Sequence, residues 1–128
     1  MNIKTALFAL PALLGLNACA PAAEAAYQTV DVAALHAAQA AGSYVLDVRT
    51  PAEYAEGHIE GATLIPLQEL NTRTAELPKD RDIYVICRSG NRSAQASELL
   101  TGAGFERIIN VAGGMGAWQA AGYPVVRP

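Results

Sequence analysis

Apolar and polar positions along this 128-residue chain fall into two alternating patterns from about residue 27 onward. Five short runs are apolar on both faces and rich in β-branched residues, which predicts buried strands. The expected strands are 27–30, 44–48, 62–65, 83–86 and 108–111. Because helix-like segments separate these runs, the pattern predicts a three-layer α/β/α fold with a parallel sheet covered on both sides.

Capping residues and glycines mark where the helices between these strands begin and end. Asp31 is a good N-cap for a helix that buries Leu35 and stops at Gly42. The sequence TPAE at 50–53 is a capping box with proline at the first helical position, and it predicts a brief helix. Further helical segments are expected at 66–77, as one or two short turns, at 93–100 and at 116–121.

The first 26 residues have the features of an export segment rather than of the folded domain. A positively charged start at 1–4 precedes an apolar run at 6–16 that is too short to span a bilayer, which predicts a signal peptide over 1–19. LNAC at 16–19 resembles the lipobox of bacterial lipoproteins, with Cys19 as the acylated residue, and ACA at 18–20 also fits ordinary signal cleavage. We expect an exported, periplasmic protein, with a tether at 20–26 and one domain at 27–128.

The amino-acid composition and net charge limit the kinds of molecule that this protein is expected to bind. A hydrophobic content of 52% suffices for one packed core, and a net charge of −3 argues against nucleic-acid binding. Two arginines within six residues then stand out as a local cationic feature that suits a small anion. We expect a monomer that meets a membrane only through a lipid on Cys19.

The candidate site is the cysteine loop, residues 87–93, which follows the expected strand 83–86. It reads Cys87-Arg88-Ser89-Gly90-Asn91-Arg92-Ser93. The unpaired N–H groups at a helix start stabilise an anion, Gly90 can adopt the positive φ that curls the loop, and both arginines add positive charge. A cysteine placed there is expected to ionise readily. The alternative, a buried packing cysteine, fits poorly with the polar residues that follow it.

Several further motifs accompany the cysteine loop in a fixed order. They are VLDVR at 45–49, YAEGHIEGA at 54–62, IP at 65–66, AGGMGAW at 112–118 and GYP at 122–124. With these motifs the chain resembles the single-domain rhodaneses, the thiosulfate sulfurtransferase family, from about residue 27 to its C-terminus. The resemblance implies a five-stranded sheet in the order 1-5-4-2-3, with the cysteine loop central, at the edge where open α/β sheets bind ligands.

The chemistry that this resemblance implies is sulfur transfer through Cys87. The thiolate would take the sulfane sulfur of thiosulfate or a related small anionic donor as a persulfide and pass it to a thiol or cyanide. Residues 88–93 would bind substrate, and Arg88 and Arg92 would orient the donor and stabilise departing sulfite. No metal and no organic cofactor is required.

Other polar residues are weaker candidates. His58 could deprotonate a cysteine, but the resemblance places it in a structural turn, and His36 is expected at the surface. Asp47 and Arg49 end a strand at the ligand-binding edge, and we expect them to form structural ion pairs with each other's neighbours. GGMG at 113–116 lacks the lysine and hydroxyl residue of a phosphate loop, and Trp118 resembles the family's core aromatic.

Two rival functions stay open. Tyrosine- and dual-specificity phosphatases also use a cysteine between a strand and a helix, and one phosphatase group shares the rhodanese fold. Their signature places arginine six residues after the cysteine, where this chain has Ser93, with Arg92 one residue earlier. The second rival is a non-catalytic sulfur-sensing or interaction module.

Overall fold

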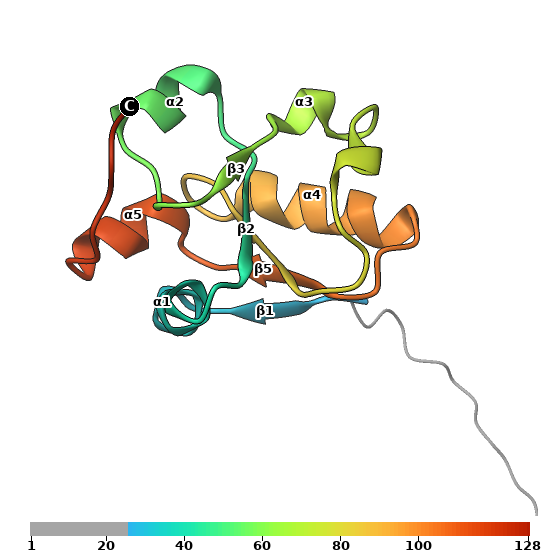
Figure 1. Ribbon diagram of the computed structural model, residues 1–128, viewed down its shortest axis with the longest axis horizontal. Coiled ribbons are helices and arrows are strands. Elements are labelled where there is room, and N and C mark those ends of the chain that lie inside the picture. Colours follow the sequence, from blue (N-terminus) through green and yellow to red (C-terminus); the bar gives the residue numbers. More distant parts are fainter. Residues whose placement is uncertain (1–25) are drawn as a thin grey trace, which may run out of the picture.

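The computed structural model describes residues 26–128, which form five strands, five α-helices and one 3₁₀-helix (Figure 1). The strands are β1 Gln28–Val30, β2 Tyr44–Asp47, β3 Thr63–Leu64, β4 Ile83–Ile86 and β5 Ile108–Val111. The helices are α1 Val32–Ala40, α2 Pro51–Glu56, α3 Leu67–Leu70, η1 Thr74–Glu76, α4 Asn91–Gly102 and α5 Gly114–Ala120. The expected signal peptide with Cys19, and all but the last residue of the expected tether, lie outside the described residues and stay predictions.

The strands form one parallel sheet in the order β1-β5-β4-β2-β3, which confirms the expected topology. In register, Leu46 of β2 lies opposite Val85 of β4, and Val85 lies opposite Asn110 of β5. Because β4 has a hydrogen-bonded strand on either side, the loop that follows it emerges from the middle of the sheet. This is the edge at which open α/β sheets bind ligands.

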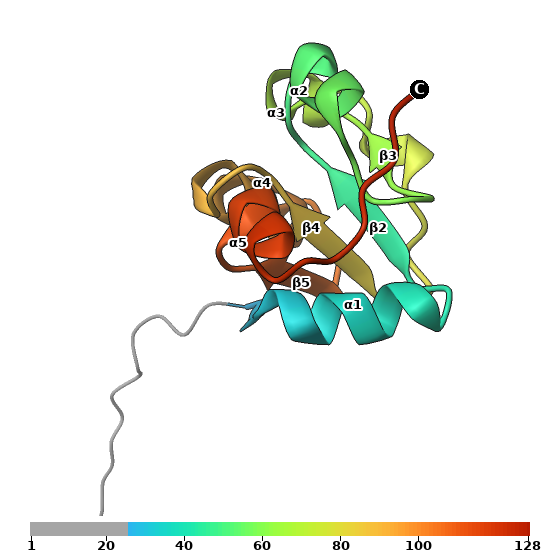
Figure 2. The same cartoon turned by 90° about the vertical axis from the view of Figure 1, so that its left-hand side faces the viewer.

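Helices cover both faces of the sheet, so the predicted three layers are present. Helices α1 and α5 pack together on one face, and α3 and α4 pack on the other (Figures 1 and 2). Leu35 and Trp118 fill the first side, and Leu70 and Leu100 fill the second. Successive residues of one strand, such as Val45 and Leu46, therefore point into different cores, which explains why the strand sequences are apolar on both faces.

Two helices begin earlier than the sequence pattern predicts. Helix α4 starts at Asn91 rather than residue 93, because Gly90 adopts φ +113° and its carbonyl accepts a hydrogen bond from the Ala94 amide at 3.2 Å. Helix α5 starts at Gly114 rather than residue 116, with the Gly113 carbonyl accepting from the Ala117 amide at 3.1 Å. The left-handed conformation that begins each helix is one that glycine adopts without steric cost. The sequence predicts one or two short helical turns within 66–77, and two are present, as α3 and η1.

The expectation that His36 lies at the surface is wrong. Its ring is half-buried and stacks on Tyr123 with 4.0 Å between ring centroids, and its edge meets Trp118 at 5.6 Å. Tyr123 and Trp118, from the C-terminal part of the chain, cover this position of α1, which the neighbouring alanines had predicted to lie at the surface.

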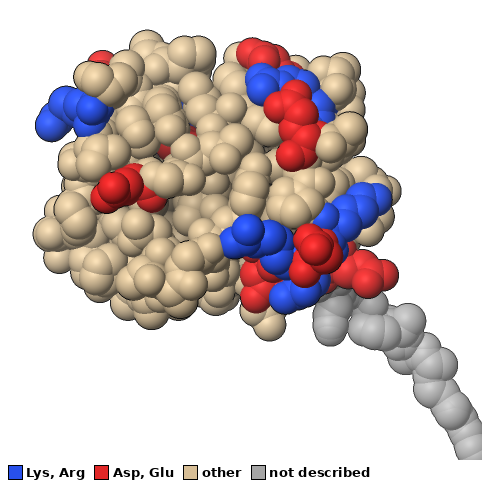
Figure 3. All heavy atoms as spheres, viewed as in Figure 1, with Lys and Arg blue, Asp and Glu red and all other residues tan. Residues whose placement is uncertain are grey.

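Most charged side chains on the face shown in Figure 3 lie in mixed groups, where positive and negative groups adjoin one another, and one acidic group lies apart from them. Arg73, for example, pairs with both Glu69 and Glu76. Within residues 26–128, no helix is both long enough and apolar enough to cross a bilayer. The same residues contain no cluster of three His, Cys, Asp or Glu side chains arranged to hold a metal ion.

Candidate active site

Cys87 lies directly after β4, and its side chain is enclosed by the loop that follows. The residue is 1% exposed, and its Sγ accepts a hydrogen bond from the Gly90 amide at 3.1 Å. The Ser93 Oγ lies 3.6 Å from the same sulfur, on the first turn of α4. The positive φ of Gly90 turns its amide inward, as the sequence predicted, so the loop presents hydrogen-bond donors to the sulfur.

These contacts decide the ionisation of the thiol. Burial raises the pKa of the Cys87 thiol, whereas hydrogen bonds from the Ser93 hydroxyl and from neighbouring loop amides lower it, and the net direction is downward. The Ser93 hydroxyl donates to the Gly90 carbonyl at 3.1 Å while the thiol is protonated. On ionisation it can rotate to donate to sulfur, because the Gly90 carbonyl keeps its bond from the Ala94 amide. The site therefore favours the nucleophilic thiolate.

The start of α5 supports the cysteine loop from behind, a feature that the sequence reasoning missed. The Met115 amide donates to the Cys87 carbonyl at 2.8 Å, and the Gly116 amide donates to the Arg88 carbonyl at 3.1 Å. Gly114 permits this approach, because a Cβ there would lie 2.5 Å from the carbonyl oxygens of both Cys87 and Arg88. Closely spaced glycines at 113, 114 and 116 were the available sign of a close backbone approach.

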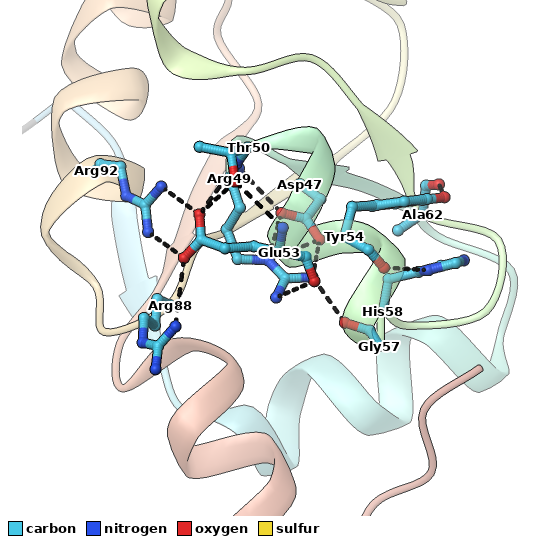
Figure 4. Close-up of polar contacts among 10 residues, drawn as sticks. All are labelled: Asp47, Arg49, Thr50, Glu53, Tyr54, Gly57, His58, Ala62, Arg88 and Arg92. Carbon is cyan, nitrogen blue, oxygen red and sulfur yellow. Dashed lines mark hydrogen bonds and ion pairs between the residues drawn. The ribbon is translucent and has the colours of Figure 1, made fainter. Parts of the chain in front are cut away.

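The two arginines of the loop converge on one carboxylate (Figure 4). Arg92 forms a bidentate pair with Glu53 of α2, with N···O distances of 2.8 and 2.9 Å. Arg88 is 70% exposed and lies 3.6 Å from the same carboxylate. From sequence, Glu53 was identified only as part of a capping box, and that box is present with Thr50.

Two of the remaining loop residues are accessible to a ligand from solvent. Ser89 and Asn91 are exposed, whereas Ser93 is buried against the sulfur. The structure thus brings Ser93 and the Gly90 amide to Cys87 itself and directs the Arg92 guanidinium to Glu53.

Asp47 and Arg49 form a buried ion pair with each other rather than with each other's neighbours. The Arg49 Nη2 lies 2.7 Å from the Asp47 carboxylate, and both side chains are no more than 5% exposed. Arg49 also donates to the Gly57 carbonyl at 2.9 Å, which ties the end of β2 to the end of α2. The structural role expected for this pair fits these contacts, with the pairing corrected.

His58 has the surroundings of a structural residue. Its ring stacks on Tyr54 with 3.6 Å between centroids, its Nδ1 lies 2.9 Å from the Tyr54 carbonyl, and its backbone pairs with Val126. Trp118 is 1% exposed and donates to the Pro124 carbonyl at 2.9 Å, as expected of a core aromatic.

A cavity of about 230 Å³ opens beside the cysteine loop, between α2 and α5. Its polar lining includes Arg49, Glu53, Glu56, Arg88, Gln119 and Arg127. The exposed Arg88 belongs both to this cavity and to the cysteine loop, so a ligand in the cavity would lie next to the loop.

Comparisons with known proteins agree with this geometry. The family model described as "Rhodanese-like domain" matches residues 31–121. A "Sulfurtransferase" from Allochromatium vinosum is 45% identical over 84 residues, which cover 66% of this chain and 78% of the relative. "Thiosulfate sulfurtransferase GlpE" from Pseudomonas entomophila is 35% identical over 88 residues, with 69% and 80% covered.

A solved structure of similar fold supports the same grouping. The crystal structure of a rhodanese-related protein from Thermoplasma volcanium superposes with a TM-score of 0.75 at 40% identity and covers 80% of this chain and 100% of that one. Among the other curated relatives, the chain spans less than two thirds of the length of several. On the extent of the family match and the likeness to this solved structure, this chain belongs to the rhodanese-like domain family.

Proposed function

We propose that this protein is a sulfurtransferase that loads sulfane sulfur onto Cys87 and passes it to a thiophilic acceptor. The observation that carries the proposal is the sulfur environment, in which the Gly90 amide lies 3.1 Å from Sγ and the thiol pKa is lowered. Family membership and relatives named as sulfurtransferases support sulfur transfer in general. Thiosulfate as donor, and cyanide or a thiol as acceptor, are the finer part of the proposal.

The first half-reaction needs only the thiolate and an oriented donor. The Cys87 Sγ attacks the outer sulfur of thiosulfate, a new S–S bond forms, and the bond to the oxidised sulfur breaks so that sulfite leaves with the electron pair. The negative charge then resides on the terminal sulfur of the persulfide, where inward-facing amides stabilise it. Exposed Arg88 is the loop cation best placed to meet an incoming anion.

The second half-reaction regenerates the enzyme. The carbon of cyanide, or the sulfur of a thiolate, attacks the terminal sulfur, and the Cys87 Sγ leaves as the thiolate. Within the described residues Cys87 is the one free cysteine, so no second thiol there could discharge the persulfide as a disulfide. The acceptor must therefore come to Cys87 from outside this domain.

Intact-protein mass spectrometry after incubation with thiosulfate tests the proposal. We expect the parent protein to gain the mass of one sulfur atom and to lose it on addition of cyanide, while Cys87→Ser gains none. Sulfur transfer by Cys87→Ser at the parent's rate would falsify the mechanism. An aryl phosphate assay on the same samples addresses the phosphatase alternative, and absence of loading with any sulfane donor would favour the non-catalytic module.

A further inference from the structure

The carboxylate of Glu53 contacts both arginines of the cysteine loop. Arg92 contacts it through two short N···O pairs, and Arg88 contacts it through one longer pair of 3.6 Å. Figure 4 shows both guanidinium groups directed toward Glu53. The positive charge that a small anionic donor would meet beside Cys87 is therefore partly neutralised by the protein itself.

The carboxylate is held in this position from its other side as well. The Thr50 amide donates to Glu53 Oε1 at 3.0 Å, and the Thr50 hydroxyl donates to the same oxygen at 3.1 Å. Glu53 is 17% exposed, and its pKa is held far below its usual range, chiefly by the hydrogen bonds from Arg92. The group thus stays negative at neutral pH and has little freedom to swing away from the loop.

A fixed negative charge at this position affects possible donors unequally. Thiosulfate approaches as a dianion and expels sulfite, so it meets repulsion from Glu53 and finds Arg92 already occupied. Cysteine persulfide carries a single net charge when its outer sulfur is ionised and none when that sulfur is protonated. The Coulomb energy between Glu53 and a donor scales with the product of their charges. Glu53 therefore disfavours binding of the thiosulfate dianion more than binding of cysteine persulfide.

We propose that Glu53 is a specificity-determining residue that selects against dianionic donors and in favour of organic persulfides. This inference rests on the sulfur transfer proposed above. In the favoured step the Cys87 thiolate attacks the outer sulfur of R–S–SH, the S–S bond breaks, and R–S⁻ leaves with the electron pair. The departing thiolate takes the proton of the outer sulfur, which leaves R–SH and the persulfide anion on Cys87.

The test is the ratio of kcat/KM for thiosulfate to kcat/KM for cysteine persulfide in Glu53→Gln. Glutamine is close in shape and still accepts from the Thr50 amide, so the cap of α2 is retained while the charge is lost. We expect the ratio to rise roughly tenfold, the effect of about 1.4 kcal/mol in favour of the dianion. The matched control is Glu98→Gln, which removes an exposed charge from α4 outside the cavity and away from Arg88 and Arg92, and should leave the ratio unchanged.

Two further variants keep the proposal falsifiable if Glu53→Gln folds poorly, as judged by urea denaturation. Glu53→Asp retains the charge and should keep the parent ratio to within about threefold. Arg92→Gln leaves the carboxylate without its bidentate partner and should lower the ratio. An unchanged ratio in Glu53→Gln, or an equal fall with both donors, would overturn the selectivity proposal while leaving sulfur transfer intact. Failure of both donors to load Cys87 in the parent would overturn both proposals.

Discussion

Removal of the Ser93 hydroxyl should raise the pKa of Cys87 without disturbing the loop. Ser93 is buried, and its Oγ lies 3.6 Å from the sulfur, so Ser93→Ala deletes one hydrogen bond that favours the thiolate. The Gly90 carbonyl, which also accepts from this hydroxyl, keeps its bond from the Ala94 amide. No buried carbonyl is thus left without a donor by the substitution, and the fold should survive it.

The magnitude follows from the geometry of this contact. A hydrogen bond to a charged group contributes about 1.5–3 kcal/mol, and one pKa unit corresponds to about 1.4 kcal/mol. The S···O distance of 3.6 Å is long, and the hydroxyl must leave the Gly90 carbonyl to reach the thiolate, so the lower end applies. We expect the pKa of Cys87 to rise by about one unit in Ser93→Ala.

The assay is the rate of alkylation by iodoacetamide as a function of pH, because only the thiolate reacts appreciably. The parent thiol has a lowered pKa and becomes reactive at lower pH than an ordinary cysteine. In Ser93→Ala the midpoint should move up by about one pH unit, so that well below both midpoints the rate falls about tenfold, while the plateau at high pH is retained.

Ser97→Ala is the matched control for this measurement. Ser97 is also a buried serine of α4, and it donates to the Ser93 carbonyl at 2.8 Å rather than to sulfur. In Ser97→Ala, the midpoint for alkylation of Cys87 should stay at the parent value. A midpoint in Ser93→Ala equal to or below that of the parent would refute the assignment of the lowered pKa to this hydroxyl.

Two further predictions address the support of the loop and the N-terminal segment. Gly114→Ala should cost about 3 kcal/mol in the free energy of unfolding and impair Cys87 loading, because its Cβ would meet backbone at 2.5 Å and its φ is +57°. Gly116→Ala, whose Cβ would lie 3.6 Å from the nearest such atom, is the control for urea denaturation and should not be destabilised. We also expect the mature protein to partition with membranes through Cys19, since lipoprotein maturation adds the several acyl chains that stable anchoring needs. Cell fractionation of Cys19→Ala should show loss of membrane association or blocked processing, and a native protein found wholly soluble with its N-terminus downstream of Cys19 would contradict the anchor.

The sequence by itself determined the layer architecture and the location of the thiol. Strands buried on both faces are apolar at almost every position, so the runs at 44–46 and 83–86 are visible without any structure. The cysteine loop is likewise local, because the turn at Gly90 and the start of α4 involve residues within a few positions of Cys87. Such interactions between residues close in the sequence can be predicted from the sequence alone.

Only the tertiary structure decided which groups meet the loop from elsewhere in the chain. Glu53 lies 39 positions before Arg92, and Gly114 lies 27 positions after Cys87, yet both contact the cysteine loop because α2 and α5 come together at the same edge of the sheet. Each residue has a sufficient local explanation, Glu53 as a helix cap and Gly114 as a residue with positive φ. A sequence pattern therefore indicates the cap and the turn. The contacts with the cysteine loop depend on how α2 and α5 pack against it, and a short segment of sequence does not reveal that packing.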